Sequence, residues 1–184
     1  SETLVRFVRE GIVHIVFGWD HVHFVFGLIL MSRRLRELLV VVPAFTLSHS
    51  VTLVLAALDI VTISPGVVEP VIALSIAWVA VEAVLDREER RSAYVATFLL
   101  GLVHGFGFSY VLRDEVGLAA ENLAPVLLSF NVGVELGQLG IVLLVYPLRA
   151  LMRERAWERR AVVVCAGLIA AMAWIWFIER IVQA

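Results

Sequence analysis

The five histidines of this sequence all stand inside long apolar stretches, together with several carboxylates and carboxamides. An ionisable side chain inside a membrane is costly, so such groups usually face the interior of a helix bundle and serve a site there. Imidazole nitrogens combined with a carboxylate favour a transition metal such as Ni, Zn, Co or Fe over Mg or Ca. The histidines are His14, His21, His23, His49 and His104.

The composition is that of a membrane protein. Of 184 residues, 61% are hydrophobic and only 17% are charged, and the mean hydropathy is +0.92. Soluble domains contain about 45–50% apolar residues, so a soluble enzyme, a disordered linker and a disulfide scaffold are excluded. The net charge of −2 gives no support for nucleic-acid binding. The single cysteine, Cys165, is expected to be a buried apolar residue.

Six apolar stretches are each long enough to cross a hydrocarbon layer of about 30 Å as a helix. Strands of a membrane β-barrel would show alternating segments of about ten residues, and the sequence has none. The fold class is therefore predicted to be all-α, a polytopic helical bundle forming a single transmembrane domain over 1–184. The expected spans are about 4–31, 38–58, 67–84, 93–112, 123–148 and 160–181.

The distribution of arginine predicts the orientation of these spans. Eleven arginines fall in the first, third and fifth connections, whereas four lie on the other side. Cytoplasmic connections carry the excess of Lys and Arg, so these three connections are predicted to be cytoplasmic and both termini extracytoplasmic. An outward N-terminus directly before a first span normally needs help to be translocated, so we also expect a signal peptide or an extracytoplasmic region upstream of Ser1.

Depth in the membrane can be estimated from the helical rise of about 1.5 Å per residue. His14, His49 and His104 then lie roughly 12–14 Å below the outer surface, and Glu135 about 16 Å below it. This common level predicts one metal site built from four helices, whose affinity should weaken as the pH falls through about 6. The alternative is that each histidine only hydrogen-bonds a neighbouring helix.

The first span carries further polar residues at helical spacing. In a straight helix His14 and His21 are about 10 Å apart, so either two successive sites exist or the helix is kinked near Gly18. Asp20 is expected to orient a histidine, and His23 points away from His21.

Other polar side chains are expected to line a path through the bundle. Ser50 follows His49, and its hydroxyl either orients that imidazole or bonds back to its own helix. Asn131 and Gln138 form a polar stripe with Glu135, and Glu69 is expected near the outer surface as a recruiting carboxylate.

Several of these stretches resemble the HupE/UreJ family of bacterial hydrogenase and urease accessory membrane proteins. They are the H-x5-D-H element from His14 to His21, the Phe45–Ser50 segment, Glu69 with Ala73-Leu74-Ser75, His104-Gly-Phe-Gly-Phe, and the segment from Phe130 to Gln138. The resemblance implies a small permease for nickel or cobalt that serves metalloenzyme assembly. It also implies metal ligands at His14, Asp20 and His21.

The sequence therefore predicts a permease of the bacterial inner membrane for a divalent transition metal, with nickel preferred and cobalt or zinc as alternatives. Its partners would be the metal ion and the lipid bilayer, and association between copies of the chain stays open. The alternatives are a packing protein that binds no metal, and an intramembrane zinc hydrolase with His14, His49 and His104 as zinc ligands. The predicted metal ligands are His14, Asp20, His21, His49, His104 and Glu135, and the path-lining residues are Glu69, Asn131, Gln138 and Ser50.

Overall fold

The computed structural model describes residues 2–85, 91–107 and 123–183, and the regular elements in these ranges are all α-helices. This confirms the predicted all-α class, as expected where lipid offers no water to unpaired backbone groups. The described helices are α1 Glu2–Phe17, α2 Trp19–Met31, α3 Leu35–Ala57, α4 Pro65–Leu85, α5 Arg91–Gly107, α7 Leu123–Met152 and α8 Glu158–Gln183.

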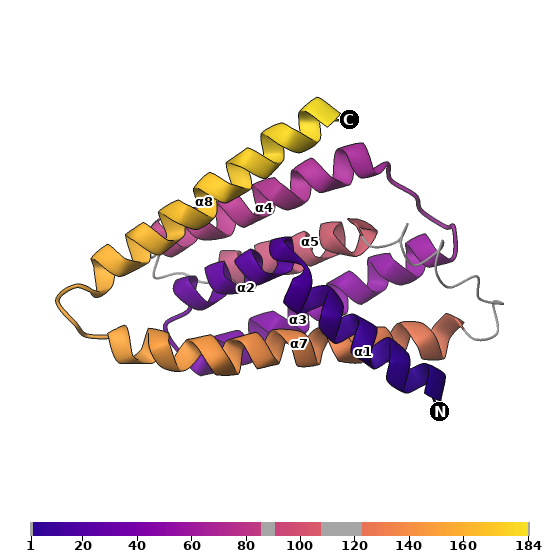
Figure 1. Cartoon of the computed structure of the whole chain (residues 1–184), viewed down its shortest axis with the longest axis horizontal. Helices are drawn as coiled ribbons and strands as arrows, with labels where there is room; N and C mark the ends of the chain where they lie inside the picture. The colour runs from indigo at the N-terminus through magenta and orange to yellow at the C-terminus, as the bar shows by residue number, and fades with distance from the viewer. Residues whose placement is uncertain (1, 86–90, 108–122, 184) are drawn as a thin grey trace.

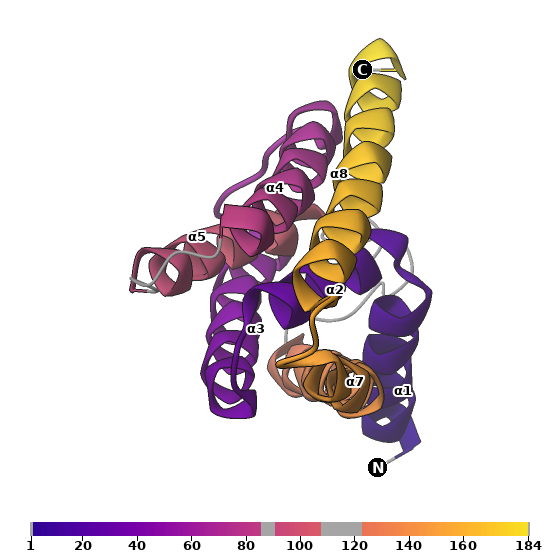
Figure 2. The same cartoon turned by 90° about the vertical axis from the view of Figure 1, so that its left-hand side faces the viewer.

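The short helix α2 occupies the centre of the bundle. It contacts α1, α4, α7 and α8, and these helices surround it in the end-on view of Figure 2. Outside this centre, the most extensive contacts join α1 to α7, α4 to α8, and α3 to α5. Because α2 is enclosed, Phe24, Val25 and Leu28 are fully buried, and the polar His21 on the same helix is buried with them.

Three of the connections between described helices lie at the ends of the molecule (Figure 1). The α2–α3 and α7–α8 connections lie at one end, whereas the α3–α4 connection and both termini lie away from it. Two glutamates cap the helices that start at the first end. Glu37 accepts a hydrogen bond from the Arg33 backbone N–H at 2.8 Å, and Glu158 accepts one from the Glu154 N–H at 2.7 Å.

The first expected span, 4–31, is not one straight helix. It divides into α1 and α2, which are bent by 70° at the break. Gly18 stands at this break in an extended conformation, with φ −76° and ψ 96°. A continuous helix through 4–31 was therefore wrong, although the kink near Gly18 that was left open is present.

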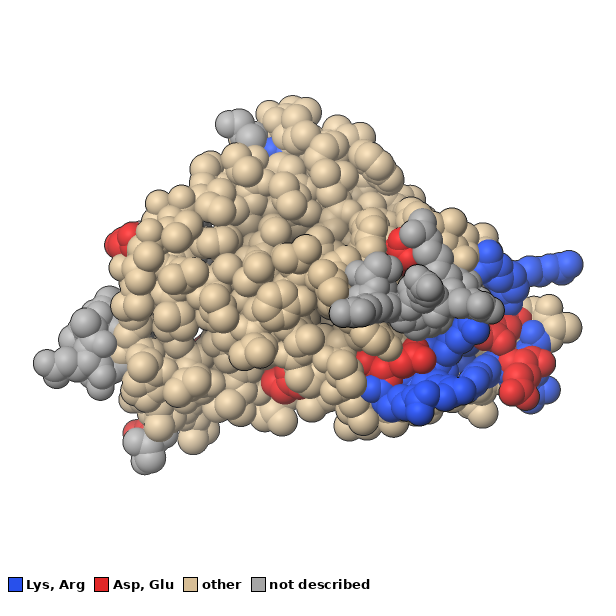
Figure 3. Space-filling model, turned by 180° about the vertical axis from the view of Figure 1, so that it is seen from behind, with Lys and Arg blue, Asp and Glu red and all other residues tan. Residues whose placement is uncertain are grey.

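In the described ranges, four helices are long and apolar enough to cross a membrane, and the bent α1–α2 pair would make a fifth span. Tyr94–Gly107 forms a shorter apolar helix, and residues 108–112 of the expected span 93–112 lie outside the described residues. Much of the visible surface in Figure 3 is uncharged, with Arg, Asp and Glu side chains gathered towards one end. Cys165, expected to be buried, is exposed on α8.

Candidate metal centre

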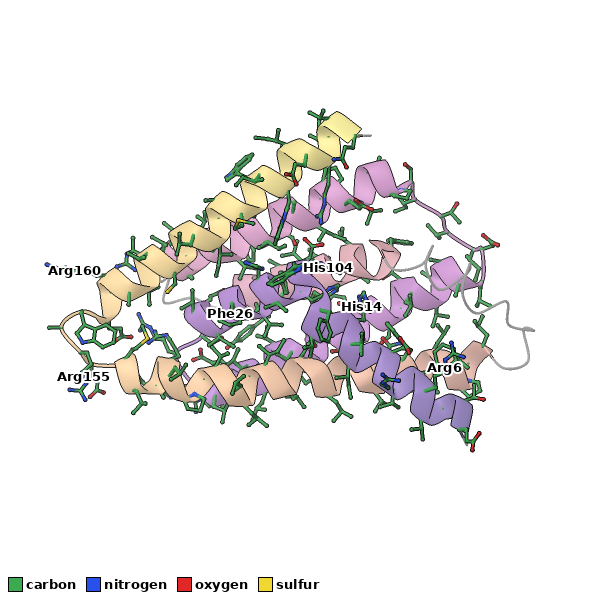
Figure 4. All side chains as sticks on the ribbon, in the orientation of Figure 1. Arg6, His14, Phe26, His104, Arg155 and Arg160 are labelled. Atoms are coloured by element: carbon green, nitrogen blue, oxygen red, sulfur yellow. The ribbon has the colours of Figure 1, made fainter. Side chains whose placement is uncertain are left out.

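Four histidine rings from four helices meet in the middle of the bundle. The ring centroids of His14 and His21 are 4.5 Å apart, and that of His49 lies 6.4 Å from His14 and 6.3 Å from His21. His104 on α5 is 5.5 Å from His21. Figure 4 shows His14 and His104 approaching this central region from different helices. We refer to His14, His21, His49 and His104 as the histidine cluster.

The bend at Gly18 is what places His14 beside His21. Had the helix continued straight, seven residues would separate the two side chains by about 10 Å. An ideal Cβ added to Gly18 would overlap the His14 carbonyl oxygen and lie 3.0 Å from Nδ1 of His21. Glycine therefore allows the chain to turn closely between the two rings, which the spacing of the sequence alone placed too far apart for one ion.

Close packing of α5 against α3 brings His104 to the cluster. Cβ atoms added to Gly101 and Gly105 would overlap Ser48 and Thr52 of α3, and both would crowd the α3 backbone. The two glycines flank His104 at the small-xxx-small spacing of closely packed membrane helices. This agrees with the packing role that their spacing predicts.

Aromatic side chains line the apolar side of the histidine cluster. Phe24 and Phe45 lie 4.9 and 5.1 Å from His104, and Phe130 lies 5.5 Å from His14. The sequence reasoning missed these residues, although Phe24 is three residues after His21 and Phe45 four before His49. That helical spacing could have indicated a shared face.

Several ring nitrogens of the cluster are buried without a hydrogen-bond partner among the described residues. They are Nε2 of His21, both nitrogens of His49, and Nε2 of His104. Nδ1 of His104 lies 3.0 Å from the Leu100 carbonyl oxygen, which can only accept a hydrogen bond. The proton is thus on Nδ1, and Nε2 presents its lone pair, as in histidines that bind metals.

The distances between the rings are compatible with a metal site, but the ring nitrogens do not converge on one position. In residues 2–85, 91–107 and 123–183, no three His, Cys, Asp or Glu side chains are positioned to hold an ion as they stand. With metal–nitrogen distances of about 2.1 Å, imidazoles on one ion have centroids roughly 4.5–6.5 Å apart. The separations of 4.5 to 6.4 Å fall within this range, so these rings are close enough to share one ion after they reorient.

Asp20, next to the cluster in sequence, pairs with an arginine from the last helix. Arg180 Nη2 donates to Asp20 Oδ2 at 2.7 Å, and Nη1 donates to the Glu69 backbone oxygen at 3.0 Å. Arg180 Nε is also 3.8 Å from the Glu69 carboxylate. Asp20 Oδ1 is buried with no hydrogen-bond partner among the described residues. Sequence reasoning had used Arg180 only to assign orientation, since nothing in the sequence pairs residues so far apart.

The polar side chains Asn131, Glu135 and Gln138 on α7 have only part of their hydrogen-bonding groups paired. Gln138 is buried and accepts a hydrogen bond from Thr46 at 2.9 Å, and Asn131 donates to the Leu127 carbonyl. Glu135 Oε2 and Asn131 Oδ1 are buried without hydrogen-bond partners in the described part of the chain. Asn131 and Ser50 also line a cavity of about 310 Å³ between α3 and α7.

Two expectations about neighbouring residues have different outcomes. Ser50 donates to the Thr46 carbonyl at 2.7 Å, so its hydroxyl bonds back to α3 and does not orient His49. His23 lies away from the cluster, as predicted. Its Nδ1 is 2.8 Å from the Trp19 carbonyl oxygen, and its ring packs edge-on against Trp176.

Comparison with known proteins identifies the family. The family model described as HupE / UreJ protein matches residues 1–180. The chain belongs to the HupE / UreJ family. No curated protein and no solved structure matches it.

Membership of the HupE / UreJ family agrees with the resemblance predicted from the sequence motifs. Together with the apolar helices, it indicates a multi-pass membrane protein with an accessory role in metal transport. The zinc hydrolase considered from the sequence gains no support from these comparisons.

Proposed function

We propose that this HupE / UreJ protein is a permease of the bacterial inner membrane that carries a divalent transition-metal ion, with nickel preferred and cobalt or zinc as alternatives. The observation that carries the proposal is the histidine cluster, in which four imidazoles from four helices meet in a buried region. Buried ring nitrogens without protein partners are costly unless a ligand satisfies them. Imidazole is a suitable ligand for these metals.

The proposed ligands are His14, His21, His49 and His104, and the carboxylates Asp20 and Glu135 would complete the coordination or assist its exchange. Transport requires a site that binds strongly enough to replace hydration but still releases the ion. A set of neutral imidazoles that needs ring rotation to close would meet this requirement. A cation moving inwards gains about 2.3 kcal/mol per charge per 100 mV of membrane potential, which supplies a driving force without ATP.

Glu69, Asn131, Ser50 and Gln138 are proposed to lie along the path of the ion. Glu69 is exposed, which fits a carboxylate that attracts cations at the outer surface. Arg180 Nε lies 3.8 Å from this carboxylate and offsets part of its charge. The shared cavity of Ser50 and Asn131 supports a path between α3 and α7. We further propose six membrane crossings, with the bent α1–α2 pair counted as one and α5 as another.

Flux into proteoliposomes tests the proposal directly. Purified full-length protein is reconstituted, an inside-negative potential is imposed, and uptake of Ni²⁺, Co²⁺ and Zn²⁺ is followed with an internal indicator. We expect uptake of at least one of these ions above that of empty vesicles, and loss of uptake in His49→Ala. His23→Ala is the matched control, because it removes a histidine outside the cluster. Stoichiometric metal binding without flux would contradict transport and favour a hydrolase or storage site.

A further inference from the structure

A cavity of about 400 Å³ lies at the arginine-rich end of the bundle, away from the histidine cluster. Its walls come from the end of α2, the end of α4, the end of α7, the α7–α8 connection and the start of α8. In Figure 3, Arg and acidic side chains gather at this end of the molecule, beside a largely uncharged surface. None of the residues proposed for metal transport lines this cavity.

The described residues that line this cavity carry a net positive charge of three. The glutamates Glu154 and Glu158 are outnumbered by five arginines. Like charges brought together in a recess repel one another, so an anion that entered would be stabilised. Guanidinium groups bind phosphate oxygens particularly well, because their planar donors match the oxygen geometry. The lining arginines are Arg33, Arg149, Arg153, Arg155 and Arg159.

Arg149 is the most constrained of these arginines. Its side chain is only 10% exposed, and Nη1 donates to Glu158 at 2.6 Å. Its Nε is buried without a hydrogen-bond partner among the described residues. A buried charged group with an unused donor is costly, so an acceptor that reached this nitrogen would be stabilised. The ion pair with Glu158 therefore satisfies only part of the hydrogen-bonding capacity of the Arg149 guanidinium.

The surroundings of the cavity are those of a membrane boundary. Leu30, Ala83, Ala156 and Val162 form its apolar lining. Leu151, Trp157 and Val163, which are sequence neighbours of lining residues, are exposed apolar side chains. Tryptophan is enriched where a helix passes from lipid to water. A ligand with an anionic head and an apolar body would fit both parts of the wall.

We propose that this cavity binds a phosphate-bearing anion, and that the headgroup of an anionic phospholipid supplies it. The phosphodiester would lie among the arginines, with Arg149 at the inner wall, and the acyl chains would follow the exposed apolar side chains of α7 and α8. A basic pocket between membrane helices is a recognised setting for such headgroups. The lipid would link α2, α4, α7 and α8 at the end where their connections meet.

Native mass spectrometry of the full-length protein in detergent tests this assignment. Phosphatidylglycerol and phosphatidylcholine are titrated separately, and the bound fraction is measured. We expect several-fold tighter binding of phosphatidylglycerol to the unmodified protein. Each arginine near an anionic lipid contributes roughly five-fold in affinity, so the double variant Arg153→Gln/Arg159→Gln should bind about 25-fold more weakly. Both substitutions leave the Arg149–Glu158 ion pair intact.

The matched control is the double variant Arg34→Gln/Arg160→Gln, which removes the same charge from two exposed arginines outside the cavity lining. We expect its affinity to fall much less than that of Arg153→Gln/Arg159→Gln, because these two exposed side chains do not line the cavity. Glu154→Gln removes a negative charge from the wall and should tighten binding a few-fold. Thermal unfolding of each variant confirms that the fold is intact.

Three results would overturn the proposal. Equal affinity for the two lipids would remove the anionic specificity. Equal weakening in both double variants would show that net charge, rather than this cavity, attracts the lipid. Inorganic phosphate that binds in lipid-free detergent with the same dependence on Arg153 and Arg159, and that displaces phosphatidylglycerol, would overturn the lipid assignment in favour of a soluble phosphate.

Discussion

His104 shows how a backbone interaction prepares a side chain for chemistry. Its Nδ1 proton is held by the Leu100 carbonyl, so Nε2 is left with its lone pair directed away from its own helix. His49 differs, because neither of its ring nitrogens has a partner among the described residues. The two imidazoles are thus unequal, with the tautomer fixed in His104 and free to change in His49.

Replacing His21, and separately His23, should distinguish a histidine inside the cluster from one outside it. We expect His21→Ala to weaken nickel binding by about ten-fold or more, because a ring within 4.5 Å of His14 and 5.5 Å of His104 is lost. His23→Ala should leave affinity within about two-fold, since that ring packs against Trp176. Equilibrium dialysis of the purified protein measures both values. Equal losses in the two variants would place His23 in the site.

The sequence could predict which residues would gather, but only in part. The common depth of His14, His49 and His104 depended on helix length and orientation alone, and these rings do lie in one region. His21 appeared too far from His14, because a glycine inside an apolar stretch occurs in straight membrane helices as well as in broken ones. The pairing of Asp20 with Arg180 could not be predicted, since spacing along the chain does not specify which helices are neighbours.

At the scale of helices, the bend between α1 and α2 depends on the small size of Gly18. We expect Gly18→Ala to lower stability by about 1–3 kcal/mol, because the added methyl group would overlap the His14 carbonyl and force the backbone to shift. Nickel affinity should fall as well, because His14 and His21 flank the bend. Thermal unfolding in detergent and equilibrium dialysis provide the two measurements.

Gly140→Ala on α7 is the matched control for this substitution. A Cβ at Gly140 would meet nothing within 4 Å, so the change should be neutral or stabilise the helix by up to about 1 kcal/mol. If Gly18→Ala behaves like Gly140→Ala in both measurements, the close turn at residue 18 is not required for the site.

Arg180 connects α8 to α2 and α4 through its contacts with Asp20 and Glu69. Its guanidinium donates to Asp20 Oδ2. Under the proposed function, a metal ion that coordinates this oxygen would compete with the guanidinium. We expect Arg180→Gln to raise nickel affinity about five-fold, a gain on the order of 1 kcal/mol for one removed charge. The same variant should unfold at a lower temperature, because α8 loses its polar contacts with α2 and α4.

Asp20→Asn provides the opposite change, since it removes the shared carboxylate charge. We expect weaker nickel binding in this variant. A fall in affinity for Arg180→Gln as large as that for Asp20→Asn would mean that Arg180 positions Asp20 instead of competing for it. Arg6→Gln, an exposed arginine on α1, controls for the loss of one positive charge.

For the whole molecule, the positions of the described connections lead to a prediction about topology. Reporter fusions at Arg34 and Arg155 should both be cytoplasmic, because these connections carry the excess of arginine and lie at the same end of the bundle (Figure 1). A fusion at Thr62, in the α3–α4 connection, should be extracytoplasmic. Opposite locations for Arg34 and Arg155 would contradict the six proposed crossings and the depth estimates built on them.

Hydropathy predicts where the apolar helices lie along the chain, although it does not predict the division of the first one into α1 and α2 or the lateral arrangement of the helices. The lengths of the apolar stretches predicted most helix limits closely, for example 123–148 against Leu123–Met152 for α7. The central position of α2 depends on which glycines permit close contact. Gly27 of α2, for instance, lies so close to α4 that an added Cβ would be 2.7 Å from Val79. Such contacts depend on the shapes of both helix surfaces, so the sequence alone does not reveal which helices pack together.

The distribution of the four imidazoles along the chain has a consequence for biogenesis. Three of them are present once α3 has been synthesised, but His104 arrives only with α5, and α7 and α8, which help to enclose α2, come later still. A chain that has entered the membrane only as far as α3 therefore presents imidazoles that no later helix has yet covered. An unfinished or truncated chain thus differs chemically from a complete one, because it exposes imidazoles that the complete bundle encloses.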